Sequence, residues 1–164
     1  MEKYIDYYSS PIGYLKVTAN NSHLYELSFN KEINEDSYPN QITKETLKQL
    51  RSYFKKELNN FTIPTNPLGT EFRLKVWKIL QEIKYGELKS YKDVAMELGS
   101  IKYVRAVGLA NGNNPIPIII PCHRVIGSNN NIIGYSGEIW RKRWLLEHEN
   151  AGFQNSLFGD DTGH

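Results

Sequence analysis

The segment GNNPIPIIIPCHRVIG, residues 112–127, limits the folds open to this chain more than any other stretch. Its prolines at positions 115, 117 and 121 exclude a continuous helix, because each removes a backbone donor and fixes φ. They also exclude an ordinary central strand. The sequence therefore predicts an ordered, rigid loop that leads into a short strand. This loop carries Cys122, the single cysteine in 164 residues.

The N-terminal part of the chain has the pattern of paired strands followed by a helix. Residues 1–30 alternate between apolar and polar side chains, and residues 20–22 suit a hairpin turn. A helix is expected with Thr43 as its N-cap and with Ile42 and Leu47 as a hydrophobic staple. Its apolar face would be Leu47, Leu50, Phe54 and Leu58. Prolines at 64 and 67 and a glycine at 69 then break the pattern, so we predict an N-terminal α+β domain over residues 1–65.

The pattern beyond residue 65 is mainly helical. Thr70 is expected to cap a helix that Tyr85–Gly86 ends, and Ser90 to cap the short helix YKDVAMEL, which stops at Gly99. A third helix is predicted in KYVRAVGLAN. Two short helices joined by about three residues that include a glycine are typical of a helix-turn-helix.

The end of the chain predicts one more helix after a loop. Residues 129–131 are expected to form a tight turn, and GYSG at 134–137 a flexible loop. In EIWRKRWLLEHE we expect a helix that Gly152 ends, with these side chains facing inward: Trp140, Trp144, Leu145 and Leu146. The prediction is thus an α+β chain with domains over 1–65 and 66–154 and a flexible tail over 155–164.

Composition excludes several classes of protein. The sequence contains no run of about 18 apolar residues, which a membrane-spanning helix needs, and the opening MEKYIDYYSS has no apolar signal region. A cytoplasmic protein is therefore expected. A single cysteine excludes an internal disulfide and a cysteine-rich zinc site. Residues 70–149 carry 12 Lys/Arg against 8 Asp/Glu. This basic excess favours a surface that faces phosphate groups.

Cys122 has two readings when its neighbours alone are considered. A lone cysteine is often a small buried hydrophobe, because its reactivity depends on how much thiolate forms. His123 is adjacent, and since neighbouring residues of a strand point to opposite faces, we expect the two to communicate through a water. A third group would orient the imidazole, with Glu147, His148 and Glu149 as candidates. The residues leave a protease, a transferase and an inert core thiol open.

A resemblance to a known family is much more specific. The segments GTEFRLKVWKIL, YGELKSY, RAVGLANGNNPIPIIIPCHRVIG and GYSGEIWRKRWLLEHE stand in this order in the chain. Together they resemble the O6-alkylguanine-DNA alkyltransferases, and SPIGYLKVTANNSHLYELSF resembles the N-terminal domain of the bacterial members. The resemblance implies a small ribonuclease-H-like N-terminal domain. It also implies a mostly helical C-terminal domain with a helix-turn-helix and an active-site loop.

The resemblance implies repair of DNA by direct reversal. The alkyl group of O6-alkylguanine would pass irreversibly to Cys122, once per molecule, with O4-alkylthymine left open as a second substrate. Glu149 would hold His123, which would act on the thiol of Cys122 through a water. Tyr91 would hydrogen-bond or protonate the base. No cofactor and no metal are expected.

The family match also assigns the contacts with double-stranded DNA, which a monomer would bind. YVRAVGLAN would enter the minor groove as the recognition helix, and Arg105 would fill the space that the flipped nucleotide leaves. The backbone carbonyls of Cys122 and Val125 would accept from the guanine amine. The expected DNA-binding residues are Ser90, Tyr91, Arg105 and Ala106, and the expected base-binding residues are Asn114, Pro117, Val125, Tyr135 and Ser136.

Three other functions compete with alkyl transfer. Alkyltransferase-like proteins bind the lesion on the same scaffold without transfer, but they lack the cysteine. A cysteine hydrolase would use Cys122 and His123 and would have no need of Arg105. A helix-turn-helix regulator would prefer one DNA sequence and would not need Cys122.

Overall fold

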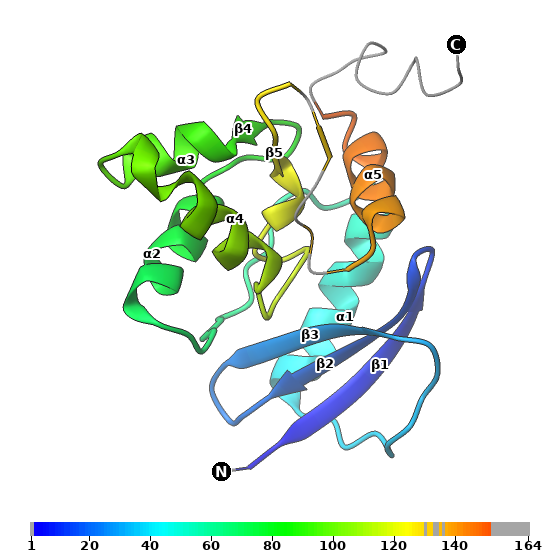
Figure 1. Ribbon diagram of the computed structural model, residues 1–164. Helices are drawn as coiled ribbons and strands as arrows, with labels where there is room; N and C mark the ends of the chain where they lie inside the picture. The colour runs from blue at the N-terminus through cyan, green and yellow to red at the C-terminus, as the bar shows by residue number, and fades with distance from the viewer. Residues whose placement is uncertain (1, 130, 133–134, 136, 152–164) are drawn as a thin grey trace. The chain divides into compact units, whose positions relative to one another are not determined.

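The computed structural model describes residues 2–129, 131–132, 135 and 137–151, and it has an α+β fold (Figure 1). The chain divides into two compact units. Unit 1 is the chain up to Leu68 together with Pro115–Ile119, and unit 2 is Gly69–Asn114 together with the chain from Ile120 onward. The loop that carries the three prolines therefore contributes five residues to unit 1 before it returns to unit 2.

Unit 1 is a three-stranded antiparallel sheet with one helix against it (Figure 1). The strands are β1 (Tyr4–Ser10), β2 (Gly13–Ala19) and β3 (Leu24–Asn30), in that order across the sheet, and the helix is α1 (Gln41–Phe54). The predicted alternation holds in β2 for Leu15 and Val17, which are fully buried. Thr18, between Val17 and Ala19, is fully buried as well, and a register shift between β2 and β3 follows it.

The start predicted for α1 is wrong by three residues. Asn40, not Thr43, is the N-cap, and the two residues form a reciprocal capping box. The backbone N–H of Thr43 donates to Asn40 Oδ1, and that of Asn40 donates to Thr43 Oγ1, both at 2.9 Å. Ile42 consequently lies inside the helix and does not form the predicted staple. Asn and Thr both favour helix starts, so the local sequence does not show which of the two residues is the N-cap.

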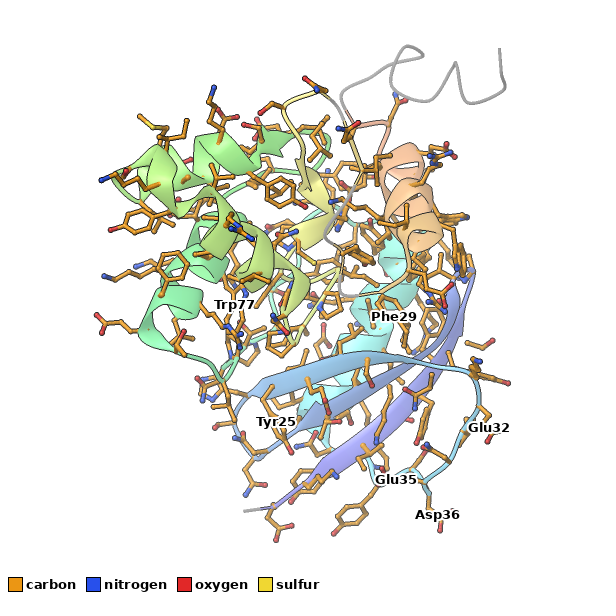
Figure 2. The ribbon with its side chains drawn as sticks, in the orientation of Figure 1. Tyr25, Phe29, Glu32, Glu35, Asp36 and Trp77 are labelled. Carbon is orange, nitrogen blue, oxygen red and sulfur yellow. The ribbon has the colours of Figure 1, made fainter. Side chains whose placement is uncertain are left out.

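Unit 2 contains four helices and a short parallel strand pair among its described residues. The elements are α2 (Glu71–Leu80), β4 (Lys89–Ser90), α3 (Tyr91–Glu97), a 3₁₀ turn (Ile101–Tyr103), α4 (Val104–Gly112), a 3₁₀ turn (Cys122–Arg124), β5 (Val125–Ile126) and α5 (Ile139–His148). Figure 2 labels Trp77 on α2, whose buried indole Nε1 donates to the carbonyl of Ala110 on α4 at 2.9 Å. This bond fixes α4 against α2.

The boundaries predicted for α2 and α3 have different outcomes. Thr70 and Ser90 cap their helices as predicted, and Gly99 follows α3 with φ of 115°. The helix α2, however, ends at Leu80 rather than at Tyr85–Gly86. After Leu80 the backbone forms tighter i to i+3 bonds, from Glu82 to Ile79 and from Ile83 to Leu80. The apolar periodicity continued beyond the helix because Ile83 is buried without being helical.

Only part of the predicted inward face of α5 is buried. Leu145 and Leu146 are fully buried as expected, but Trp140 is 47% exposed. Lys142 takes a fully buried place instead, because residues 142, 145, 146 and 149 recur at helical spacing. Gly152 and the predicted tail lie outside the described residues, as does part of the turn at 129–131.

The proline-containing segment forms the predicted loop and short strand. Residues 113–121 are neither helix nor strand, and the chain then enters the 3₁₀ turn and β5. Within unit 1, Ile118 has φ of 76° although it is β-branched, a conformation that costs about 1–2 kcal/mol. Because Ile118 is almost completely buried, packing holds it in this conformation.

Candidate active site

Cys122 begins a buried 3₁₀ turn between the loop and β5. Cys122 and His123 are fully buried and Arg124 nearly so. The following strand β5 pairs in parallel with β4, so that Ile126 lies opposite Ser90, the cap of α3. Cys122 and His123 are thus neighbours in a turn, whereas the sequence predicts that they are neighbours in a strand. The proline at 121 explains this, because it breaks strand pairing just before the cysteine.

The carboxylate of Glu149 binds both residues that follow the cysteine. Its Oε2 lies 2.7 Å from His123 Nε2. Its two oxygens accept from Arg124 Nε and Nη2 at 2.9 and 3.0 Å, while Arg124 Nη1 donates to the carbonyl of Ile83 at 2.6 Å. Glu149 is the C-cap of α5. Of the three candidates left open by the sequence, Glu147 is exposed and His148 stacks on Trp144, so Glu149 alone is bonded to the imidazole.

Electrostatics make this cluster an anionic carboxylate beside a neutral imidazole. Burial alone would raise the pKa of Glu149, but the charges and hydrogen bonds of His123 and Arg124 outweigh it and hold this pKa below its usual range. Complete burial lowers the pKa of His123, because imidazolium loses its hydration, although Glu149 opposes this effect. An ionised carboxylate can only accept, so Nε2 of His123 carries the proton and donates it.

The other ring nitrogen of His123 is available for chemistry. Within the described part of the chain, His123 Nδ1 is buried and has no hydrogen-bond partner. With the proton on Nε2, Nδ1 is the basic atom of the ring. The cluster can therefore accept a proton at Nδ1 while Glu149 stabilises the imidazolium that forms.

A second buried network surrounds Tyr91, and the sequence analysis missed two of its members. Asn111 of α4 donates from Nδ2 to the carbonyl of Cys122 at 3.2 Å and to Tyr91 Oη at 3.5 Å. Lys142 of α5 donates from Nζ to the carbonyl of Val125 at 2.6 Å and to Tyr91 Oη at 3.3 Å. Asn111 and Lys142 thus link the phenol on α3 to the backbone carbonyls of Cys122 and Val125.

The helical spacing of apolar residues could have revealed both missed members. Asn111 falls on the buried face of α4 with Val107 and Ala110, and Lys142 falls on the buried face of α5 with Leu145 and Leu146. A polar residue on an apolar helix face is costly unless it is bonded, which makes such a position a candidate for function.

The ionisable groups of this network keep their protons near neutral pH. Burial lowers the pKa of Lys142 to about 8, against the opposing charge of Cys122. Burial raises the pKa of Tyr91, and the charge of Cys122 adds to this effect. The pKa of Tyr135, which lies outside this network, is raised by the same two causes. Tyr91 and Tyr135 are consequently neutral phenols that can donate a proton or a hydrogen bond.

The remaining residues that the sequence singled out fall in three places. Asn114 donates from Nδ2 to the carbonyl of Ile120 at 2.7 Å, which joins the two ends of the loop within unit 2. Pro117 is buried in unit 1, and Ser136 lies outside the described residues. On the surface of unit 2, Arg105 is exposed and Ser90 and Ala106 are partly exposed.

The described residues contain no group of three or more His, Cys, Asp and Glu side chains placed to hold a metal ion. They also contain no helix that is both long enough and apolar enough to cross a membrane.

Comparison with known proteins identifies the family. Residues 71–151 match the model of the 6-O-methylguanine DNA methyltransferase DNA-binding domain, and residues 3–67 match that of its ribonuclease-like domain. The chain therefore belongs to the 6-O-methylguanine DNA methyltransferase family. A methylated-DNA–protein-cysteine methyltransferase of Methanosarcina barkeri is 43% identical over 152 residues, which cover 89% of this chain and 96% of the relative.

Solved structures agree with the family assignment. The O6-methylguanine methyltransferase of Mycobacterium tuberculosis superposes with a TM-score of 0.81 at 40% identity, over 96% of this chain and 99% of that one. The Mycobacterium tuberculosis protein in complex with DNA superposes with a TM-score of 0.79 at 42% identity, over 93% and 97% of the two chains.

Proposed function

We propose that this protein repairs DNA by moving the alkyl group of O6-alkylguanine onto Sγ of Cys122, irreversibly and once per molecule. The observation that carries the proposal is the buried His123–Glu149 pair, whose histidine lies in the same turn as Cys122 and has an unpartnered Nδ1. The relatives named above are methylated-DNA–protein-cysteine methyltransferases, which fits a single reactive sulfur.

The proposed chemistry balances with the groups at hand. The thiol proton of Cys122 passes through a water to His123 Nδ1, and Glu149 stabilises the imidazolium. The thiolate attacks the alkyl carbon, the C–S bond forms as the C–O6 bond breaks, and the electron pair of the broken bond goes to the purine. Tyr91 supplies a proton or a hydrogen bond to the leaving base, which its raised pKa keeps available. The thioether has no ready leaving group, so turnover ends there.

The damaged base must leave the duplex to reach this thiol. Cys122 is fully buried, so a paired base cannot approach it, and a flipped base must displace part of what covers the sulfur. The carbonyls of Cys122 and Val125 accept from the guanine amine, and Tyr135 with Ser136 closes over the base. Asn114 and Pro117 shape the loop on which the thiol is presented.

The DNA surface of the proposal is the helix pair α3 and α4, acting as a helix-turn-helix in the minor groove. Arg105, Gly108 and Leu109 share the outward face of α4, with Leu109 67% exposed. A side chain added at Gly108 would meet nothing within 4 Å, so packing inside the protein does not require this glycine. Glycine inside a helix costs about 1 kcal/mol relative to alanine, which supports a close approach by a partner.

The other contacts of the proposal follow from the ends of these helices. Ser90 and Tyr91 begin α3, and Ala106 lies beside Arg105, which fills the gap in the base stack. The protein acts as a monomer, with a ribonuclease-H-like N-terminal domain over residues 1–65, a DNA-binding and transfer domain over 66–154 and a tail over 155–164. The function requires no cofactor.

The deciding experiment is intact-mass analysis after the reduced protein has met duplex DNA that contains O6-methylguanine. We expect a gain of one methyl group per molecule, mapped to Cys122 and absent in Cys122→Ser. Folded protein that binds the lesion without a mass change would instead indicate an alkyltransferase-like module. Turnover of a soluble ester or amide would indicate a hydrolase, and preference for one undamaged sequence would indicate a regulator.

A further inference from the structure

Asn111 occupies an acceptor that the proposed substrate also needs. The carbonyl of Cys122 accepts from the backbone N–H of Val125, which closes the 3₁₀ turn, and from Asn111 Nδ2 at 3.2 Å. A carbonyl oxygen has two lone pairs. Both are therefore used before any base arrives. The exocyclic amine of guanine can bond to this carbonyl only by taking the place of the Asn111 amide.

The Asn111 side chain is placed for such an exchange. It is fully buried on α4, and it also donates to Tyr91 Oη at 3.5 Å. The two hydrogens of an amide nitrogen can serve two acceptors, so the side chain keeps the phenol as a partner when it gives up the carbonyl. The carbonyl of Val125 differs, since the Lys142 ammonium donates to it at 2.6 Å, and a charge-assisted bond is harder to displace.

A base without the exocyclic amine need not leave the Cys122 carbonyl short of a donor. When a buried acceptor is left without a donor, the site rejects the ligand that fails to supply one. Here the acceptor keeps its donor, because Asn111 stays in place if the base carries no exocyclic amine. The loss that would normally penalise such a base does not occur at this carbonyl.

We propose that Asn111 is a specificity-determining residue whose amide stands in for the guanine amine at the Cys122 carbonyl, so that the site also accepts O6-alkylated purines without that amine. The inference rests on the proposed function. It adds a substrate class, of which O6-alkylhypoxanthine is the simplest member.

The test compares two duplexes that differ only in carrying O6-methylguanine or O6-methylhypoxanthine. Single-turnover rate constants for methylation of Cys122 are measured with protein in saturating excess, for the wild type and for Asn111→Leu. We expect the wild type to repair both lesions at rates within about tenfold of each other. In Asn111→Leu the carbonyl of Cys122 keeps only the Val125 N–H as a donor. The ratio of the guanine rate to the hypoxanthine rate should rise by about tenfold or more, because only guanine restores the second donor.

The ratio is insensitive to partial loss of folding. Each ratio is taken within one variant, so a partly folded preparation lowers both rates and leaves the ratio unchanged. Asn113→Leu is the matched control, because Asn113 also donates to a backbone carbonyl, that of Leu109 at 2.8 Å, but is exposed; its ratio should equal that of the wild type. Asn111→Ala provides a second variant if Asn111→Leu does not fold.

Each outcome has one meaning. An unchanged or lowered ratio in the Asn111 variants, with normal methylation of Cys122 in the wild type, would overturn the inference and leave the proposed function in place. A wild type that never becomes methylated by O6-methylguanine would overturn the proposed function itself.

Discussion

The two units bury different kinds of polar side chain. In unit 1 the buried polar residues are all neutral: Thr18, Thr43, Thr46 and Gln49. In unit 2 they include four ionisable groups: His123, Arg124, Lys142 and Glu149. Buried neutral groups need only hydrogen bonds, whereas buried charges carry a desolvation cost of several kcal/mol each. Unit 2 thus accepts a cost in stability that unit 1 avoids, as functional sites often do.

Glu149→Gln should have the largest effect on stability of the substitutions considered. The substitution leaves the buried Arg124 guanidinium without its carboxylate, and the free energy of unfolding should fall by about 3–5 kcal/mol. Methylation of Cys122 should slow as well, because nothing then stabilises a charged His123. Urea denaturation and single-turnover rates measure the two effects.

A matched change in unit 1 shows what a neutral buried amide contributes. Gln49→Leu removes the acceptor of the Thr62 N–H at 2.9 Å and should cost about 1–3 kcal/mol, with the methylation rate unchanged in the folded fraction.

Arg124→Gln added to Glu149→Gln should recover part of the stability. If the double variant is no more stable than Glu149→Gln, an uncompensated charge is not the cause.

The contrast marks the boundary of what the sequence could predict. The rigid loop before Cys122, the caps Thr70 and Ser90 and the existence of the helices follow from local patterns, which depend on near neighbours. Glu149 could be chosen only through the family resemblance, because residues 147–149 share one helix end and sequence spacing does not show which reaches His123.

Long-range polar contacts explain the errors. Lys142 stands in WRKRW between two arginines, a context typical of a solvated face, and its acceptors come from other elements of unit 2. Trp140 was placed inward because large apolar side chains usually are, whereas the buried face of α5 belongs to Lys142. Charge and size thus mispredict the positions of Lys142 and Trp140, and the acceptors on α3 and β5 explain why Lys142 is buried.

Acid should reveal the buried histidine of unit 2. The folded-state pKa of His123 lies below its ordinary value because of burial, so below pH of about 6.5 the unfolded chain binds a proton that the folded protein refuses. The free energy of unfolding should therefore fall by up to about 1.4 kcal/mol per pH unit from pH 6.5 toward the folded-state pKa. Urea denaturation at pH 7, 6 and 5 measures this slope.

The histidine control lies in unit 1. His123→Gln should flatten the slope between pH 6.5 and 5, and His23→Gln, which changes a histidine that is not buried, serves as the control. Equal slopes in the wild type and His123→Gln would show that burial of this ring does not cause the acid sensitivity.

Lys142→Met should separate stability from function within unit 2. A pKa lowered from 10.5 to about 8 corresponds to about 3 kcal/mol of cost for the buried charge. Methionine removes this cost but also the bonds to Tyr91 and Val125, so the free energy of unfolding at pH 7 should change by only about 1 kcal/mol. Methylation should slow by about tenfold as the phenol and the carbonyl lose their common donor.

The change in stability above pH 8 tests the lowered pKa of Lys142. Between pH 8 and about 10 the unfolded chain holds a proton that folded Lys142 releases, so stability of the wild type should rise with pH. The rise should be missing in Lys142→Met. If stability depends on pH in the same way in both proteins, the buried ammonium of Lys142 does not lower the free energy of unfolding.

The smallest effect on folding is expected for the exposed cation of α4. Arg105→Ala should alter the free energy of unfolding by no more than about 0.5 kcal/mol, because the side chain lies on the surface. It should nevertheless slow repair of O6-methylguanine in duplex DNA far more than alkylation of Cys122 by free O6-benzylguanine, since a free base needs no extrusion. Equal slowing with both substrates would show that Arg105 does not serve extrusion. A large loss of stability would place Arg105 with the buried charges of unit 2, against its exposure.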